Sequence, residues 1–146
     1  MSTVLGCTQL DHVVETGLSA DETLRRQVWE ILAGLGPQAH HPERRTVQRF
    51  PYPNLLYLTP VAADGITPDG ESIVVVGKHL SERGLGFFYQ HPLPDRRMIA
   101  SLEGKDARWV GFLVDITWCR FTQHGWYDSG GRFLHALPSP IERQVR

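Results

Sequence analysis

The chain has few cysteines, no long apolar run and no excess of either charge. Its two cysteines, Cys7 and Cys119, are too few and too far apart to indicate a disulfide framework or a zinc site. No apolar segment approaches the roughly 20 residues that a membrane-spanning helix needs. Fifteen lysines and arginines stand against sixteen acidic residues, which disfavours a general nucleic-acid-binding protein. Any anion-binding site must therefore be local.

The lack of a signal segment and the small number of cysteines also indicate the cellular compartment. The N-terminal stretch lacks the basic start and continuous apolar segment of a secretory signal. Two widely spaced cysteines are typical of reduced thiols, so we expect a cytoplasmic protein that does not associate with a membrane. With 146 residues and 41% hydrophobic residues, the chain is long enough for one globular domain with a proper core.

One amphipathic helix is predicted near the N-terminus. Ser19 and Glu22 have the spacing of a capping box, which satisfies unpaired backbone N–H groups at a helix start. An apolar stripe at helical spacing follows, formed by Leu24, Val28, Ile31, Leu32 and Leu35. Glycines and Pro37 then end the helix. We predict a helix over about residues 20–33 of an N-terminal extension (1–42), with its apolar face buried against the body of the protein.

The rest of the chain has the pattern of β-structure. Runs rich in β-branched, aliphatic and aromatic residues, separated by turn residues, predict six strands at 54–63, 72–80, 84–91, 97–103, 108–122 and 126–137. Short spacing without intervening helices favours an antiparallel barrel or sandwich over residues 43–137. Simple alternation in the fifth strand would put Asp115, Thr117 and Cys119 on one face. Residues 138–146 are expected to form a polar tail.

Two polar segments suggest a local anion site. The stretch "ERRTVQR" (residues 43–49) contains three arginines, and "HLSERG" (residues 79–84) combines a hydroxyl, a cation and a glycine in an expected turn. An arginine can pair bidentately with phosphate oxygens or with guanine O6 and N7, and can stack on a base. Pro51 and Pro53 disfavour a helix after the arginines, which leaves them on an extended lead-in.

In order and spacing these segments resemble the two motifs of PilZ domains. The first motif, Arg-x-x-x-Arg before the first strand, is matched by Arg45 and Arg49, with Arg44 in the common flank. The second, Asp/Asn-x-Ser-x-x-Gly, is matched at Ser81 and Gly84, while His79 stands at the Asp/Asn position. With "YDSGGRF" (residues 127–133) as closing strand, the resemblance covers about residues 43–137. It implies a mostly β fold: a six-stranded antiparallel PilZ-like barrel, here with an N-terminal helical extension.

The resemblance also implies a ligand, the bacterial second messenger cyclic di-GMP. The expected ligand-binding residues are Arg44, Arg45, Arg49, His79, Ser81 and Gly84. The arginines would meet the phosphates and guanines, and the other three would form the barrel side of the site. A neutral imidazole offers one donor and one acceptor where the family has a carboxylate or carboxamide. Gly84 is expected to permit a turn closed to other residues and close approach of the ligand.

The predicted function is therefore a cyclic di-GMP receptor that changes conformation on binding and signals to an unidentified downstream protein. No catalytic residue, metal site or cofactor is predicted, because His40 and His41 stand without further ligands and Cys119 has no orienting partner. One alternative is a PilZ-like interaction module that has lost nucleotide binding, which His79 would favour. Another is a barrel for single-stranded nucleic acid, which the balanced charge disfavours.

Overall fold

The computed structural model describes residues 19–34, 48–104 and 107–141, and its first element is a helix. Helix α2 (Ala20–Gly34) occupies the predicted range. The capping box forms as expected: the Glu22 amide donates to Ser19 Oγ at 3.1 Å, and the Ser19 amide donates to Glu22 Oε1 at 3.2 Å. In the described ranges no helix is both long and apolar enough to cross a membrane.

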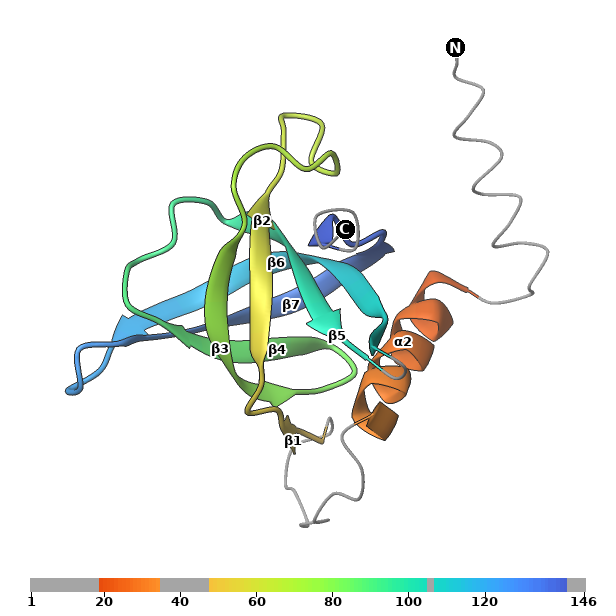
Figure 1. Cartoon of the computed structure of the whole chain (residues 1–146), viewed down its shortest axis with the longest axis horizontal. Helices are drawn as coiled ribbons and strands as arrows, with labels where there is room; N and C mark the ends of the chain where they lie inside the picture. The colour runs from red at the N-terminus through yellow and green to blue at the C-terminus, as the bar shows by residue number, and fades with distance from the viewer. Residues whose placement is uncertain (1–18, 35–47, 105–106, 142–146) are drawn as a thin grey trace.

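Seven strands follow in the described part of the chain, and six of them close into a barrel (Figure 1). Their bounds are β1 Phe50–Pro51, β2 Leu55–Pro60, β3 Ile73–Leu80, β4 Gly84–Tyr89, β5 Arg97–Glu103, β6 Trp109–Phe121 and β7 Tyr127–Leu137. The sheet order is β3-β2-β5-β6-β7-β4, and β4 pairs back with β3, so the ring closes. Every pairing is antiparallel. The predicted six-stranded antiparallel barrel with an N-terminal helix is confirmed.

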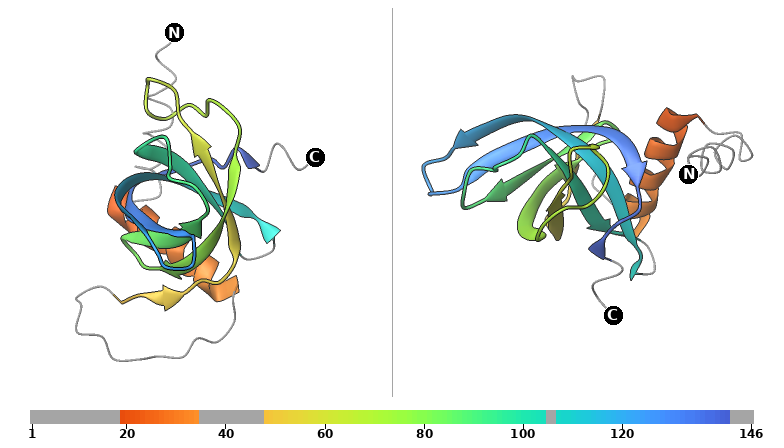
Figure 2. Two further views of the ribbon diagram at one scale, coloured as in Figure 1. Left: turned by 90° about the vertical axis from the view of Figure 1, so that its left-hand side faces the viewer. Right: turned by 90° about the horizontal axis from the view of Figure 1, so that it is seen from above.

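Helix α2 closes one end of this barrel. Val28 and Ile31 of its apolar stripe are fully buried in the same cluster as inward-facing strand residues such as Leu56, Phe87 and Phe112, while Leu35 lies outside the described residues. Seen along the barrel axis in the left view of Figure 2, the helix lies behind the ring of strands. The prediction that its apolar face packs against the body of the protein is confirmed. The expected boundary between extension and barrel, at residues 42 and 43, lies outside the described residues.

The strand β1 was not predicted. It consists of only two residues, and it pairs with the end of β3 so that Phe50 lies opposite Leu80 and Pro51 opposite His79. Phe50 is buried in the core cluster, which fixes the chain at this point. A two-residue strand that includes Pro51 leaves no periodic pattern for sequence reasoning to detect.

The predicted face of the long strand β6 is wrong beyond Thr117. A bulge between Ile116 and Trp118 inserts Thr117 as an extra residue. As a result Asp115 and Trp118 lie opposite Arg132 and Gly130, which are alternate residues on one face of β7. Trp118 therefore joins Asp115 on that face, and the expected Cys119, which lies opposite Ser129, turns to the other face.

The C-terminal segment also differs from the expected polar tail. Ser139, Pro140 and Ile141 are buried, and Ile141 is only 2% exposed. Ser139 Oγ donates to Ser101 Oγ at 2.7 Å and accepts the Ile141 amide at 3.1 Å. These bonds attach the segment to β5, so its first residues are part of the packed protein.

Candidate anion-binding site

The site begins where the lead-in meets the end of β3. Because Phe50 pairs with Leu80, Arg49 is placed beside the turn that starts at Ser81. Arg49 is exposed. Among the described residues it has no ion-pair partner. Its guanidinium is therefore available to an anion from solvent.

The turn between β3 and β4 is shaped by Ser81. The Ser81 amide donates to the Gly84 carbonyl at 2.9 Å. Its hydroxyl accepts the Arg83 and Gly84 amides, both at 3.2 Å, and donates to the Gly84 carbonyl at 3.3 Å. These bonds use the one donor and both lone pairs of the hydroxyl. The side chain is largely buried. A direct bond from Ser81 to a ligand would therefore have to replace one of them.

Gly84 is needed for a different reason from the one expected. Its backbone is not in the left-handed region that favours glycine, since Gly65, Gly70 and Gly125 are the described glycines with positive φ. A Cβ at Gly84 would instead lie 2.1 Å from the carbonyl oxygen of Gly131 on β7. The missing side chain thus lets β4 and β7 approach each other at the turn.

At two further glycines on the outer face of the barrel, an aromatic ring of another residue packs directly against the glycine backbone. Gly86 and Gly130 are cross-strand partners on β4 and β7. A Cβ at Gly86 would lie 2.7 Å from Nε2 of His79, and one at Gly130 would lie 2.5 Å from the Trp118 ring. The His79 imidazole therefore lies directly over the backbone of Gly86, and the Trp118 indole over that of Gly130. Any residue with a side chain at either glycine would displace the ring.

These elements enclose a cleft of about 490 Å³, which we name the arginine cleft. It is lined by Arg49, His79, Ser81, Arg83, Gly84, Leu85, Thr117, Trp118, Gly131 and Arg132. Three of these side chains are guanidiniums, and none is a carboxylate. Arg49, Arg83 and Arg132 are all exposed. The arginine cleft is thus locally cationic on a chain whose net charge is close to zero.

Asp115 sets the position of one side of the cleft. It lies opposite both Arg97 and Arg132 in the sheet. Its buried carboxylate accepts two bonds from Arg96, at 2.7 and 3.2 Å, while Arg132 Nε lies 3.9 Å from it. Hydrogen bonds from Arg96 hold the pKa of Asp115 below its ordinary value. Because Arg96 engages the carboxylate directly, Arg132 is only loosely paired.

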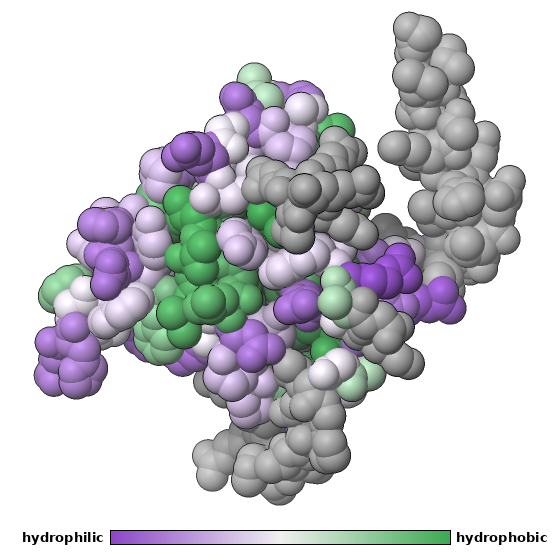
Figure 3. Space-filling model, in the orientation of Figure 1, coloured by the Kyte–Doolittle hydropathy of each residue, from purple (hydrophilic) through white to green (hydrophobic). Residues whose placement is uncertain are grey.

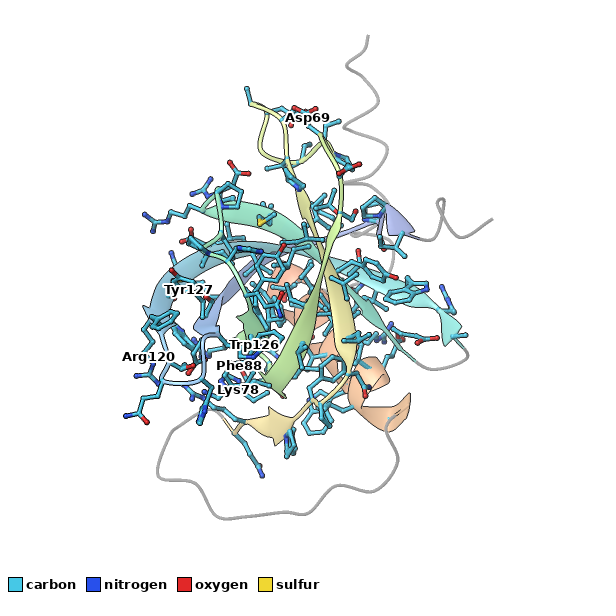
Figure 4. All side chains as sticks on the ribbon, turned by 60° about the vertical axis from the view of Figure 1, so that its left-hand side comes forward. Asp69, Lys78, Phe88, Arg120, Trp126 and Tyr127 are labelled. Atoms are coloured by element: carbon cyan, nitrogen blue, oxygen red, sulfur yellow. The ribbon has the colours of Figure 1, made fainter. Side chains whose placement is uncertain are left out.

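A second cluster of charged side chains, Lys78, Arg120 and Asp128, lies beside Trp118. Lys78 Nζ and Arg120 Nη2 approach Asp128 Oδ2 at 3.0 and 3.3 Å. Both cations also lie within 6 Å of the Trp118 ring, with Lys78 at 5.8 Å and Arg120 at 5.7 Å from its centroid. Figure 4 shows Lys78 and Arg120 on this side of the barrel. The indole is therefore fixed between the Gly130 backbone and two cations.

Four of the six expected ligand residues line one cleft: Arg49, His79, Ser81 and Gly84. Arg44 and Arg45 lie outside the described residues. Sequence reasoning missed Trp118 and Arg132, and gave no specific role to Arg83. Arg132 reaches the cleft because it pairs with Gly84 across β4 and β7, and the sequence contains no signal for that pairing. In the described ranges no group of three potential metal ligands occurs.

No protein-family model and no curated protein matches the chain. Among solved structures, the inhibitor of motility (MotI/DgrA) of Bacillus subtilis is similar at 9% sequence identity and a TM-score of 0.47. The match covers 73% of this chain and 48% of that one, so the chain spans about half the length of that protein.

Proposed function

We propose that the protein is a cytoplasmic receptor for cyclic di-GMP of the PilZ type, without enzymatic activity. The observation that carries the proposal is the convergence of Arg49, Arg83 and Arg132 at the turn between β3 and β4, in a cleft whose described lining contains no carboxylate. The second motif runs from His79 at the end of β3 through this turn to Gly84, and Arg49 is the last arginine of the first motif.

The chemistry of the cleft suits such a ligand. Cyclic di-GMP carries two phosphodiester charges and two guanines. Guanidinium forks can pair with the phosphates or with guanine O6 and N7. The cleft lining also includes the His79 imidazole and the Trp118 indole, aromatic groups that could contact a base. A volume of about 490 Å³ is within the range of small-ligand pockets, which runs from roughly 300 to 1,000 Å³.

Binding would change the position of the lead-in. Arg49 directly precedes Phe50, whose ring packs edge-on against Trp29 of α2 with a centroid distance of 5.3 Å. Trp29 Nε1 in turn donates to Glu82 Oε2 at 2.7 Å. A ligand that draws Arg49 toward the turn therefore acts on two residues that contact the same helix side chain. The downstream protein would recognise the resulting position of the lead-in or the helix.

Calorimetric titration with cyclic di-GMP tests this function. We expect the wild-type protein to bind and Arg49→Ala to lose at least about ten-fold in affinity, because a charge-assisted contact is removed. Arg108→Ala is the matched control, since Arg108 is exposed but is not among the residues that line the cleft. Guanosine monophosphate serves as the control ligand. Equal affinity of wild type and Arg49→Ala for cyclic di-GMP would exclude this mechanism.

The second candidate is an interaction module that no longer binds nucleotide. An apolar groove of about 300 Å³ favours it, lined by Val76, Phe88, Thr122, His124 and Trp126. Figure 4 shows Phe88 close to Trp126, which lies in the turn between β6 and β7. Apolar side chains also gather over β3 in Figure 3, where Val74 is 44% exposed. Such a surface is suited to contact with a protein partner.

Restoring the family residue at position 79 separates the two candidates. If the chain is a receptor, wild type and His79→Asn both bind cyclic di-GMP, because a carboxamide can also contact a guanine edge. If nucleotide binding has been lost through His79, wild type shows no binding at tens of micromolar and His79→Asn regains it. Thermal unfolding of both proteins confirms that each sample is folded.

A further inference from the structure

A second cavity lies between helix α2 and the barrel. Its volume is about 460 Å³, and it is lined by Leu24, Arg25, Glu82, Arg83, Arg132, Phe133 and Leu134. Arg83 and Arg132 line this helix-side cavity and also the arginine cleft. The two spaces therefore share a wall made of two guanidiniums, and both side chains are exposed.

The helix-side cavity is cationic as well. Arg25, Arg83 and Arg132 contribute three positive charges, and Glu82 contributes the one carboxylate among the described lining residues. That carboxylate already accepts the Trp29 indole N–H at 2.7 Å. A cavity with a surplus of guanidiniums attracts an anion, and forked donors favour phosphate oxygens.

The packing of α2 fixes the direction of Arg25. The neighbouring Leu24 is 8% exposed, and Val28, one turn later, is fully buried in the core. These anchors determine which way the helix is rotated, so Arg25 is placed at the rim of the cavity. Arg26 is the next residue on the helix and is also exposed, but it is not among the described residues that line either cavity.

We propose that Arg25 is a further ligand-binding residue, which contacts a phosphodiester of the dinucleotide from the helix side. The inference rests on the proposed function. A ligand seated in the arginine cleft extends past Arg83 and Arg132, and its second phosphodiester reaches Arg25. Helix α2 is then part of the binding site itself, and the ligand bridges helix and barrel. Each of the two shared guanidiniums lies between the two charged groups of the ligand.

Titration of charge variants on α2 with cyclic di-GMP tests the role of Arg25. We expect Arg25→Gln to bind about ten-fold more weakly than wild type, because one charge-assisted contact is lost. Arg25→Lys should retain most of the affinity, since it keeps the charge. Arg26→Gln is the matched control, which removes the same charge from the adjacent residue, and its affinity should equal that of the wild type. Guanosine monophosphate has one phosphate, so Arg25→Gln should leave its binding unchanged.

Each alternative result has a distinct meaning. If wild type binds but Arg25→Gln binds equally well, the role of Arg25 is refuted and the proposed function stands. If Arg26→Gln weakens binding as much as Arg25→Gln, the effect is one of overall charge, which also refutes a contact at Arg25. If wild type does not bind cyclic di-GMP, both proposals fail together. Thermal unfolding of Arg25→Gln at the wild-type temperature shows that the helix remains docked.

Discussion

At the scale of single residues, the site depends on positions that lack a side chain. Gly84 allows β4 to approach the backbone of β7, and Gly86 and Gly130 lie under the rings of His79 and Trp118. The consequences of adding a Cβ differ between them. At Gly84 the obstacle is a backbone carbonyl, which cannot rotate away, whereas at Gly86 it is the ring of a side chain. We therefore expect Gly84 to matter mainly for the stability of the fold, and Gly86 mainly for the position of the His79 ring in the cleft.

Alanine substitutions should separate these two roles. We expect Gly84→Ala to lower the free energy of unfolding by about 1–3 kcal/mol, because overpacking shifts the backbone. Gly86→Ala should cost less stability but displace the His79 imidazole, and so weaken cyclic di-GMP binding by about ten-fold. Urea unfolding and calorimetric titration of both variants measure the two effects. A Gly86→Ala protein that is as destabilised as Gly84→Ala would contradict the assignment.

At the scale of elements, helix α2 is held by its apolar face and by one indole. Ile31 and Val28 are fully buried in the barrel core. Trp29 is about half exposed, and it joins the lead-in at Phe50 to the turn at Glu82. The helix is therefore a component of the barrel core, and its exposed edge connects both motifs of the site.

Truncation of the buried face should release the helix. We expect Ile31→Ala to lower the free energy of unfolding by about 2–5 kcal/mol, because it leaves a cavity at the closed end of the barrel. Glu30→Ala is the matched control at the exposed neighbouring position, and it should change stability by less than about 0.5 kcal/mol. Urea denaturation followed by circular dichroism measures both. Equal stabilities of Ile31→Ala and Glu30→Ala would show that the helix does not contribute to the core.

Comparison of these elements with the sequence shows what could be predicted. The helix was found because its apolar residues recur at helical spacing, and the six barrel strands were found because runs of β-branched, aliphatic and aromatic residues lie between turn residues. Two residues of β1, the bulge at Thr117 and the packed segment after β7 leave no periodic signal. Four residues that line the candidate site were predicted through the two motifs, while Trp118 and Arg132 were missed. Both come to the cleft only through cross-strand pairing and the bulge, which a linear sequence does not display.

At the scale of the whole molecule, a nearly neutral chain concentrates positive charge on one outer face of a closed barrel. The buried Asp115 is central to this arrangement, because it stands among Arg96, Arg97 and Arg132. Hydrogen bonds from Arg96 lower its pKa in the folded state. A carboxyl whose folded pKa is lowered stabilises the protein above its ordinary pKa of about 4, and this contribution is lost as pH falls through the lowered value.

Acid unfolding should therefore depend on Asp115. The wild-type free energy of unfolding should fall as pH decreases below about 4. Asp115→Asn should be less stable than wild type near neutral pH, and should lose less stability on acidification, because the titrating carboxylate is absent. Urea denaturation at about pH 7, 4 and 2.5 measures the difference. Parallel stability curves for the two proteins would show that the Arg96–Asp115 pair does not stabilise the fold.

The central claim is that a cyclic dinucleotide binds in the arginine cleft. Nuclear magnetic resonance titration of the isotope-labelled protein with cyclic di-GMP tests it most directly. We predict that the largest shifts occur at the amides of residues 81–85, at Arg132 and at the indole N–H of Trp118, since all of them line the cleft or its turn. Shifts confined to the apolar groove around Phe88 and Trp126, or no shifts at all in a folded sample, would contradict the claim.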